Sequence, residues 1–435
     1  MFAPGHLGEL TQIVPFEMVD AALESGRAVQ TRVRDLPSRV VVYLLLAGAL
    51  FAEIGYTGVW AKLVAGLEGL SVASPDSSAL SQARRRIGAA PLRELFALLK
   101  GPAAGALRWR GMLVCAVDGT SVYVAASPAN LAAYRRHSAG PNGDSGYPMM
   151  RLVAIVACGT RTVLDAVFGP DSSGETTYAP QLFTCLGPRT LLLADRNFDA
   201  AKIIESAAAN GAQLLIRGKL TRKMAILARL PDGSWLTRLG TVELRIIDAD
   251  ILITSTRDGA VTRRVEHYQF LTTLTDHRRY RADDLVELYH QRWEIETSYL
   301  ELKSSILGGR VLRARYPELV NQEIYALLIT YQVLRTAIAD TALASPAISP
   351  DRASFTIALN TARDQVILAA GVIADTVVDL VGTIGRAVLA APLPSRRARA
   401  CPRIVKRAIS KHRAKGNIDR NAYRIQVTIE ILGDG

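Results

Sequence analysis

Cysteine and histidine are scarce in this sequence, and neither is spaced for a metal centre. The 435 residues include six histidines and four cysteines, Cys115, Cys158, Cys185 and Cys401. No two cysteines form a Cys-x-x-Cys pair and no histidines lie at ligand spacing, so zinc chemistry is disfavoured. Thiols in apolar runs without a partner pattern are typical of reduced cysteines. We therefore expect a cytoplasmic protein.

Long hydrophobic runs are also missing. The most apolar stretch, Val40–Ala52, has 13 residues, whereas a membrane-spanning helix needs roughly 20. The N-terminal MFAPGHLGEL lacks the basic-then-apolar order of a signal peptide. We expect no membrane segment, and we interpret Val40–Ala52 as a buried helix.

Acidic residues are outnumbered by basic ones. The chain has 52 Lys and Arg against 40 Asp and Glu, which gives a formal net charge of +12. This excess indicates an anionic partner, with nucleic acid as the leading candidate, and a basic solvated surface as the alternative. Hydrophobic residues make up 49% of the chain, enough for a sizeable core. The length favours about three domains.

Residues 1–105 are predicted to form an all-helical domain. Ser38 and the pair Ser74-Pro75 are typical helix starts, and a further helix is expected over Pro91–Lys100. A basic cluster precedes that last helix and comprises Arg84, Arg85 and Arg86. Short helices with such a cluster suit a small DNA-binding domain, and they suit a plain helical bundle equally well.

The hydrophobic period changes in residues 106–218. Five short apolar runs predict strands, the second and third of them paired as a hairpin: Met112–Val117, Arg151–Cys158, Thr162–Phe168, Thr190–Ala194 and Gln213–Arg217. Helices are expected over Pro180–Leu186 and Ala200–Asn210. The order strand, hairpin, helix, strand, helix, strand predicts a mixed α/β sheet.

Three further segments complete the expected organisation. Residues 219–280 contain short alternating runs separated by turn signals, which predict an antiparallel β insertion. Helical patterns return in residues 281–343. Residues 344–435 are expected to hold two helices and a basic tail, Arg396–Lys415, which has nine Lys or Arg and no acid. Such a tail is typical of a solvated, phosphate-seeking segment.

The stretch YHQRWEIETSYLELK, residues 289–303, places an unusual set of side chains on one side of a predicted helix. At about 100° per residue, four of them share a sector beside the core stripe: Tyr289, Arg292, Glu296 and Lys303. The predicted core stripe comprises Leu288, Ile295, Tyr299, Leu302 and Ile306. The side predicted to face water comprises Glu287, His290, Glu294, Ser298 and Glu301. A simple Arg292–Glu296 pair explains neither the tyrosine nor the lysine.

Two aspartates provide partners for Glu296. Asp118 and Asp195 each end a short apolar strand, and ligands gather at the carboxyl ends of strands in open α/β sheets. A turn-forming role is the alternative for Asp118. Three converging carboxylates would suit Mg²⁺, which prefers oxygen ligands, and two such ions can support an in-line phosphoryl displacement.

The four residues of the helical set match the signature Y-x2-R-x3-E-x6-K, and in this the sequence resembles the insertion-sequence-4 family of bacterial DDE transposases. VDGT at 117–120 resembles the first acidic motif of that family, and ADRNFD at 194–199 resembles the second. The segment from Gly5 to about Leu67 resembles the N-terminal domain of one branch of the family.

The resemblance implies an RNase H-like core interrupted by the β insertion. It implies that Asp118, Asp195 and Glu296 hold Mg²⁺, for which Mn²⁺ can substitute. The implied activity is metal-dependent DNA cleavage at transposon ends followed by strand transfer into target DNA. The implied partners are terminal inverted repeats, target DNA and a second copy of the chain in a synaptic complex, which would place the protein at the nucleoid.

The resemblance also assigns DNA contacts. It places Tyr289, Arg292 and Lys303 against the DNA backbone beside the cut, in keeping with their chemistry. We expect Arg84, Arg85 and Arg86 to contribute to recognition of the element ends. An insertion tryptophan stacks on a flipped base in some relatives, but no local motif ties Trp235 to that role, and a core or turn position is favoured.

Two alternatives stay open on the sequence. One is a metal-dependent endonuclease of the same fold that cuts without joining, and the other is an inactive DNA-binding relative. A covalent role for Tyr289, as in tyrosine recombinases, is disfavoured because three carboxylates would repel the scissile phosphate unless a metal intervened.

Overall fold

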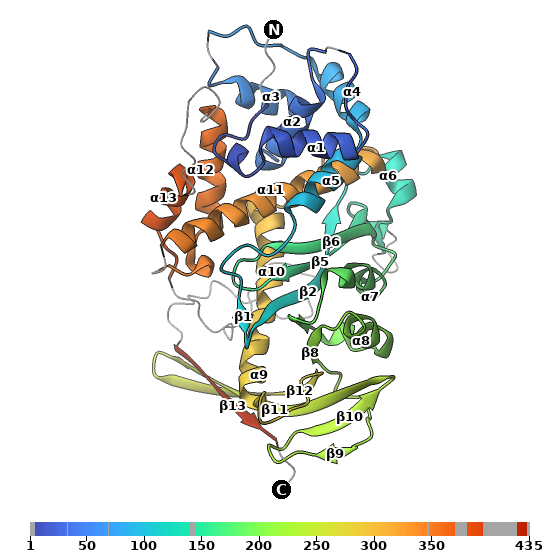
Figure 1. The fold of residues 1–435 in the computed structure, drawn as a ribbon, viewed down its shortest axis with the longest axis vertical. Helices are drawn as coiled ribbons and strands as arrows, with labels where there is room; N and C mark the ends of the chain where they lie inside the picture. The colour runs from blue at the N-terminus through green and yellow to red at the C-terminus, as the bar shows by residue number, and fades with distance from the viewer. Residues whose placement is uncertain are drawn as a thin grey trace. The chain divides into compact units, whose positions relative to one another are not determined.

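The computed structural model describes residues 5–32, 34–67, 69–138, 144–345, 348–369, 381–394 and 424–432 (Figure 1). The chain forms two compact units. The first unit comprises Met1–Cys185 and Trp293–Leu393, and the second comprises Leu186–Arg292 and Pro394–Gly435. The boundaries between the five segments expected from the sequence stay a prediction.

The N-terminal part of the first unit is helical, as expected. It contains α1 (Phe16–Ser25), α2 (Ser38–Leu50), α3 (Tyr56–Val64), α4 (Ser77–Ile87) and α5 (Ala90–Leu99). The apolar helix α2 is buried along its length, which confirms the interpretation of that run. Helix α4 begins later than Ser74-Pro75 predicted, because Asp76 caps it: the Asp76 side chain accepts the N–H of Ala79 at 2.6 Å.

An antiparallel group of strands follows in the same unit. Strand β2 (Met112–Tyr123) pairs with β5 (Met149–Ala157), and β5 pairs with β6 (Val163–Pro170). The smaller elements are β1 (Arg108–Trp109), α6 (Pro128–Ala133), β3 (His137–Ser138), β4 (Asp144–Ser145) and α7 (Glu175–Tyr178). The predicted hairpin is confirmed. The predicted helix over Pro180–Leu186 is instead a 3₁₀ helix, Ala179–Cys185.

The stretch 289–303, which carries the signature residues and is called the signature segment below, enters the first unit at α10 (Trp293–Leu300), which continues into a π-helix, Glu301–Ile306. Helix α10 packs on β2 and β5, and the π-helix contacts α11 (Pro317–Ala344) and α12 (Phe355–Ile367). A further helix, α13 (Gly382–Ala390), packs on α11 and α12. The segment therefore lies between strands on one side and helices on the other.

The second unit contains the remaining strands. Its strand order is β7-β8-β12-β11-β10-β9, with β7 and β8 parallel and the others antiparallel. The elements are β7 (Thr190–Ala194), the 3₁₀ turn Arg196–Phe198, α8 (Ala201–Ala208), β8 (Gln213–Arg217), β9 (Ala228–Arg229), β10 (Trp235–Leu239), β11 (Val242–Arg257), β12 (Ala260–Thr272), α9 (Ala282–Tyr289) and the 3₁₀ turn His290–Arg292. The β insertion is confirmed. Trp235 in β10 donates its indole N–H to Asp248 at 3.1 Å.

The longest strand that the sequence analysis missed lies near the C-terminus. Strand β13 (Arg424–Ile431) pairs antiparallel with β11, where the sequence analysis placed only helices and a tail. The alternation of Ile425, Val427, Ile429 and Ile431 is the pattern that indicates it. The basic tail Arg396–Lys415 lies outside the described residues. Among those that are described, no helix has both the length and the apolar character needed to cross a bilayer.

Candidate active site

A tyrosine from the signature segment hydrogen-bonds to the backbone at the first acidic position, Asp118. Asp118 is half-buried in β2, and its Oδ1 accepts the N–H of Gly119 at 2.8 Å. The hydroxyl of Tyr299 in α10 donates to the Asp118 carbonyl at 2.7 Å and accepts the N–H of Ala154 at 3.1 Å. Asp118 and Ala154 are partners in the β2–β5 ladder, so Tyr299 bridges the two strands at the aspartate.

The hydroxyl of Tyr299 is protonated at neutral pH. Burial raises the pKa of Tyr299 well above its usual value, and the nearby charges of Asp118 and Glu175 raise it further. A protonated phenol can donate one hydrogen bond and accept another, as this bridge requires.

Glu296 and Lys303 come from the same segment as Tyr299. Glu296 is half-buried and precedes Tyr299 by about one helical turn. The Nζ of Lys303, in the π-helix, donates to the Thr120 hydroxyl at 3.1 Å. Within the first unit, the segment bearing Glu296 is therefore fastened to β2 at Asp118 and at Thr120.

The other tyrosine of the segment, Tyr289, hydrogen-bonds to the backbone next to the second acidic position, in the second unit. Asp195 follows β7, and its Oδ1 accepts the N–H of Asn197 at 2.8 Å. The buried Tyr289 donates its hydroxyl to the carbonyl of Ala194 at 3.1 Å. Burial raises the pKa of Tyr289, so this donor stays protonated. The ring packs edge-on against Phe270, with centroids 4.9 Å apart.

Asp199, the other acid of the second motif, has a structural role. Its carboxylate is buried, accepts the N–H of Lys219 at 2.9 Å and pairs with Arg222 at 3.1 Å. These contacts leave Asp195, which is half-buried, as the acid of this motif that is available for chemistry.

The three predicted carboxylates divide between the two units. Asp118 and Glu296 belong to the first unit and Asp195 to the second, and the chain passes from the second to the first between Arg292 and Trp293. In the described ranges, no group of three or more His, Cys, Asp or Glu side chains is arranged to hold a metal ion. Convergence of the three carboxylates stays a prediction.

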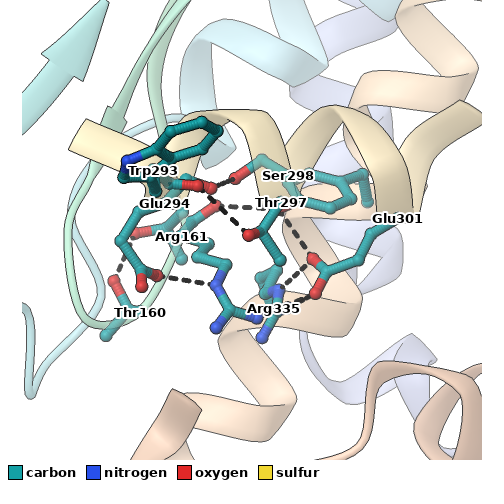
Figure 2. Close-up of polar contacts among 10 residues, drawn as sticks. Thr160, Arg161, Trp293, Glu294, Thr297, Ser298, Glu301 and Arg335 are labelled. Carbon is teal, nitrogen blue, oxygen red and sulfur yellow. Dashed lines mark hydrogen bonds and ion pairs between the residues drawn. The ribbon is translucent and has the colours of Figure 1, made fainter. Parts of the chain in front are cut away.

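The signature segment is not one regular helix. It runs through α9, a 3₁₀ turn, α10 and a π-helix. The predicted core stripe is buried, but the prediction that Glu294, Ser298 and Glu301 face water is wrong, because all three are buried. Figure 2 shows the reason: Arg161 and Arg335 lie on that side and pair with the two glutamates.

The arginine cluster of α4 makes internal contacts. The buried guanidinium of Arg84 lies 3.8 Å from the ring centroid of Tyr56, and Arg86 donates to the Leu36 carbonyl at 2.7 Å. Arg85 is exposed and stacks 4.8 Å from the Tyr316 ring. The geometry gives Arg84 a packing role. DNA contacts by these three arginines, by Tyr289 and by the buried Arg292 stay predictions.

Three functional candidates escaped the sequence analysis. Tyr299 was predicted only as part of the core stripe, and a phenol within an otherwise aliphatic stripe was the available signal. Arg161 and Arg335 carry no motif, since each meets its glutamates only through the tertiary fold.

Comparison with known proteins identifies the family of this chain. Residues 4–97 match the family described as Insertion element 4 transposase N-terminal, and residues 109–333 match the family described as Transposase DDE domain. The chain is 27% identical over 405 residues, 90% of each chain, to Transposase InsG for insertion sequence element IS4 of Escherichia coli (strain K12). It is also 27% identical over 191 residues to the Putative transposase InsZ of the same strain, covering 42% of this chain and 62% of that protein.

A solved structure is similar at greater distance. A piggyBac transposase synaptic complex with hairpin DNA aligns over 92% of this chain and 86% of that chain, with a TM-score of 0.44 and 11% identity, which is too remote to support an argument. The matched families cover both the helical N-terminal region and the α/β region that holds Asp118, Asp195 and Glu296. The chain therefore belongs to the transposase DDE-domain family: it is a DDE transposase of the insertion-sequence-4 type, a divalent-metal-dependent enzyme of DNA transposition with an RNase H-like core.

Proposed function

We propose that Asp118, Asp195 and Glu296 form the catalytic set, with Mg²⁺ as the ion and Mn²⁺ able to replace it. The supporting observation is that two tyrosines of the signature segment bind the backbone at the two aspartates: Tyr299 at Asp118 and Tyr289 at Ala194, next to Asp195. The segment that supplies Glu296 thus supports both of the other carboxylates.

The side chains fit a hard divalent cation. All three are half-buried carboxylates, and magnesium prefers oxygen ligands of this kind. A backbone N–H fixes one oxygen of Asp118 and one of Asp195, which orients each carboxylate. Bound ions of this type stabilise the attacking and leaving oxygens of an in-line phosphoryl displacement.

Two tyrosines and a lysine of the signature segment would position the DNA and the β-strands that carry the aspartates. Tyr299 holds the Asp118 backbone, and Tyr289 holds the backbone before Asp195. Lys303, placed at Thr120 beside Asp118, offers a point charge to a DNA phosphate. The substrates would be the terminal inverted repeats and the target DNA, bound by a homodimer that joins two ends in one synaptic complex.

A strand-transfer assay tests this function. Linear DNA bearing the element's terminal repeats is incubated with the full-length protein, target plasmid and Mg²⁺, and both nicked ends and joined products are measured. Transposition predicts joined product. Cutting without joining would instead support an endonuclease of the same fold, and DNA binding without cutting would support an inactive relative.

The phosphate contact of Lys303 makes a separate prediction. Replacing Lys303 by Ala should weaken binding to end DNA and reduce the slope of log affinity against log salt by about one, because one phosphate contact is lost. The measurement is a salt titration by fluorescence anisotropy. The control is Lys202→Ala, at an exposed lysine of α8, which should keep the wild-type slope. An unchanged slope in Lys303→Ala would remove the lysine from the DNA interface.

A further inference from the structure

We propose that Arg161 and Arg335 are positioning residues for the signature segment, which carries Glu296. Their buried ion pairs with Glu294 and Glu301, on the back of that segment, set the direction in which Glu296 and Lys303 point. The proposal rests on the proposed catalytic role of Glu296.

The contacts form a continuous network, which Figure 2 shows in close-up. Arg161 donates from Nε to Glu294 at 2.6 Å and from Nη1 to Glu301 at 2.8 Å. Arg335 donates from Nε to Glu301 at 3.0 Å and also from Nη2 to the other oxygen of that carboxylate. The Tyr331 hydroxyl adds a 3.2 Å bond to Glu301. Each arginine therefore uses two donors in a fixed planar geometry.

The four side chains of the network are buried, and their charges cancel. The relative exposures are 4% for Arg161, 1% for Glu294, 7% for Glu301 and 0% for Arg335, and two positive charges face two negative ones. A buried ion pair gives little net stability compared with apolar residues of similar volume, and its best-attested use is to fix one arrangement among several. A directional role therefore accounts for this network better than a stabilising one.

Helical geometry places the network opposite the proposed catalytic side chains. At about 100° per residue, Glu294 and Glu301 lie within roughly 20° of each other, whereas Glu296 lies about 200° from Glu294. Rotation of the segment would move both groups together. Because the paired carboxylates are held by two rigid forks, the orientation of Glu296 on the other side is fixed as well.

The two arginines come from different layers of the first unit. Arg161 lies in the turn between β5 and β6, and Arg335 lies in α11. Arg161 has a φ of 61°, a left-handed conformation that residues other than glycine, asparagine and aspartate seldom adopt. The inward guanidinium explains an arginine at this position, since the backbone alone would favour glycine. The segment is thus held between the strands and α11.

The test replaces an arginine by lysine, which keeps the charge and removes the fork. Full-length Arg335→Lys should fold and should bind end DNA like the wild type. It should need about tenfold to a hundredfold more Mg²⁺ for half-maximal single-turnover cutting, the range seen when outer-shell groups that orient metal ligands are changed. Arg315→Lys, at an exposed arginine, is the matched control and should match the wild type.

The metal requirement distinguishes positioning from stability, because a loss of folded molecules lowers the amount of product without changing the half-maximal Mg²⁺ concentration. Folded Arg335→Lys with the wild-type cutting rate and metal requirement would overturn the proposal. If this variant does not fold, the double variant Glu301→Gln with Arg335→Met provides the test, because it removes both charges of that ion pair. The same increase in the half-maximal Mg²⁺ concentration is expected. A wild-type metal requirement in the double variant would contradict the proposal. Normal cutting by Glu296→Gln would refute the proposed catalytic set itself, a separate outcome.

Discussion

Replacing Asp118, Asp195 or Glu296 by its amide is expected to lower the rate of DNA-end cutting by roughly a thousandfold, while DNA binding stays nearly unchanged. Metal-held charge stabilisation of the reacting oxygens supplies several kcal/mol, and each ~1.4 kcal/mol corresponds to a factor of ten in rate. Amides keep the size of the side chains but remove the charge that holds the ions. The measurement is single-turnover cutting of labelled end DNA with Mg²⁺, with binding followed in Ca²⁺.

The control for this series is Glu287→Gln. Glu287 is an exposed acid in α9, close in sequence to Glu296, and its amide should cut at the wild-type rate. Each of the three carboxylates is tested separately. Normal cutting by any one amide variant would exclude that residue from the catalytic set.

Arg313→Ala is expected to destabilise the protein by about 3 kcal/mol, the lower end of the range found when one partner of a buried ion pair is removed, because Glu323 is buried but Arg313 is half-buried. Arg313 pairs with Glu323 at 3.2 Å and donates to the carbonyls of Ile54 at 2.7 Å and Gly48 at 2.6 Å. Its guanidinium also lies 4.5 Å from the Tyr56 ring centroid. The alanine variant would leave the Glu323 carboxylate and two main-chain carbonyls without this donor.

Urea unfolding followed by circular dichroism measures this effect. Arg315→Ala provides the comparison, since Arg315 is two residues away and exposed, and surface substitutions of this kind usually change stability by less than about 0.5 kcal/mol. Equal unfolding midpoints for the two variants would show that Arg313 does not hold the N-terminal helices to the rest of the first unit.

Much of the fold could be predicted because its signals are local. Thr190–Ala194 and Gln213–Arg217 are strands with the predicted bounds, since each is a short apolar run between turn residues. The buried helix α2 follows from the same logic. Strand β13 was missed because its pairing with β11 joins distant parts of the chain, and the start of α4 was misplaced because Asp76 is the better cap.

The candidate site residues could be predicted from the sequence, but the residues that hold the signature segment in place could not. Spacing alone selected Glu296 and Lys303. The helical wheel placed Glu294 and Glu301 on one side of the segment, but the prediction that this side faces water failed. Charged residues can be buried when they are paired. The partner Arg161 lies 133 positions from Glu294, a relation that no local pattern encodes.

The pairing of β11 with β13 has a consequence for protein synthesis. Strand β11 ends at Arg257, whereas β13 begins only at Arg424. On the ribosome, the β11 stretch that β13 will cover emerges long before its neighbour exists, and an open strand edge can template association with other nascent chains. Prematurely terminated translation products would keep that edge uncovered. Solubility is therefore expected to depend on complete translation of the reading frame through β13.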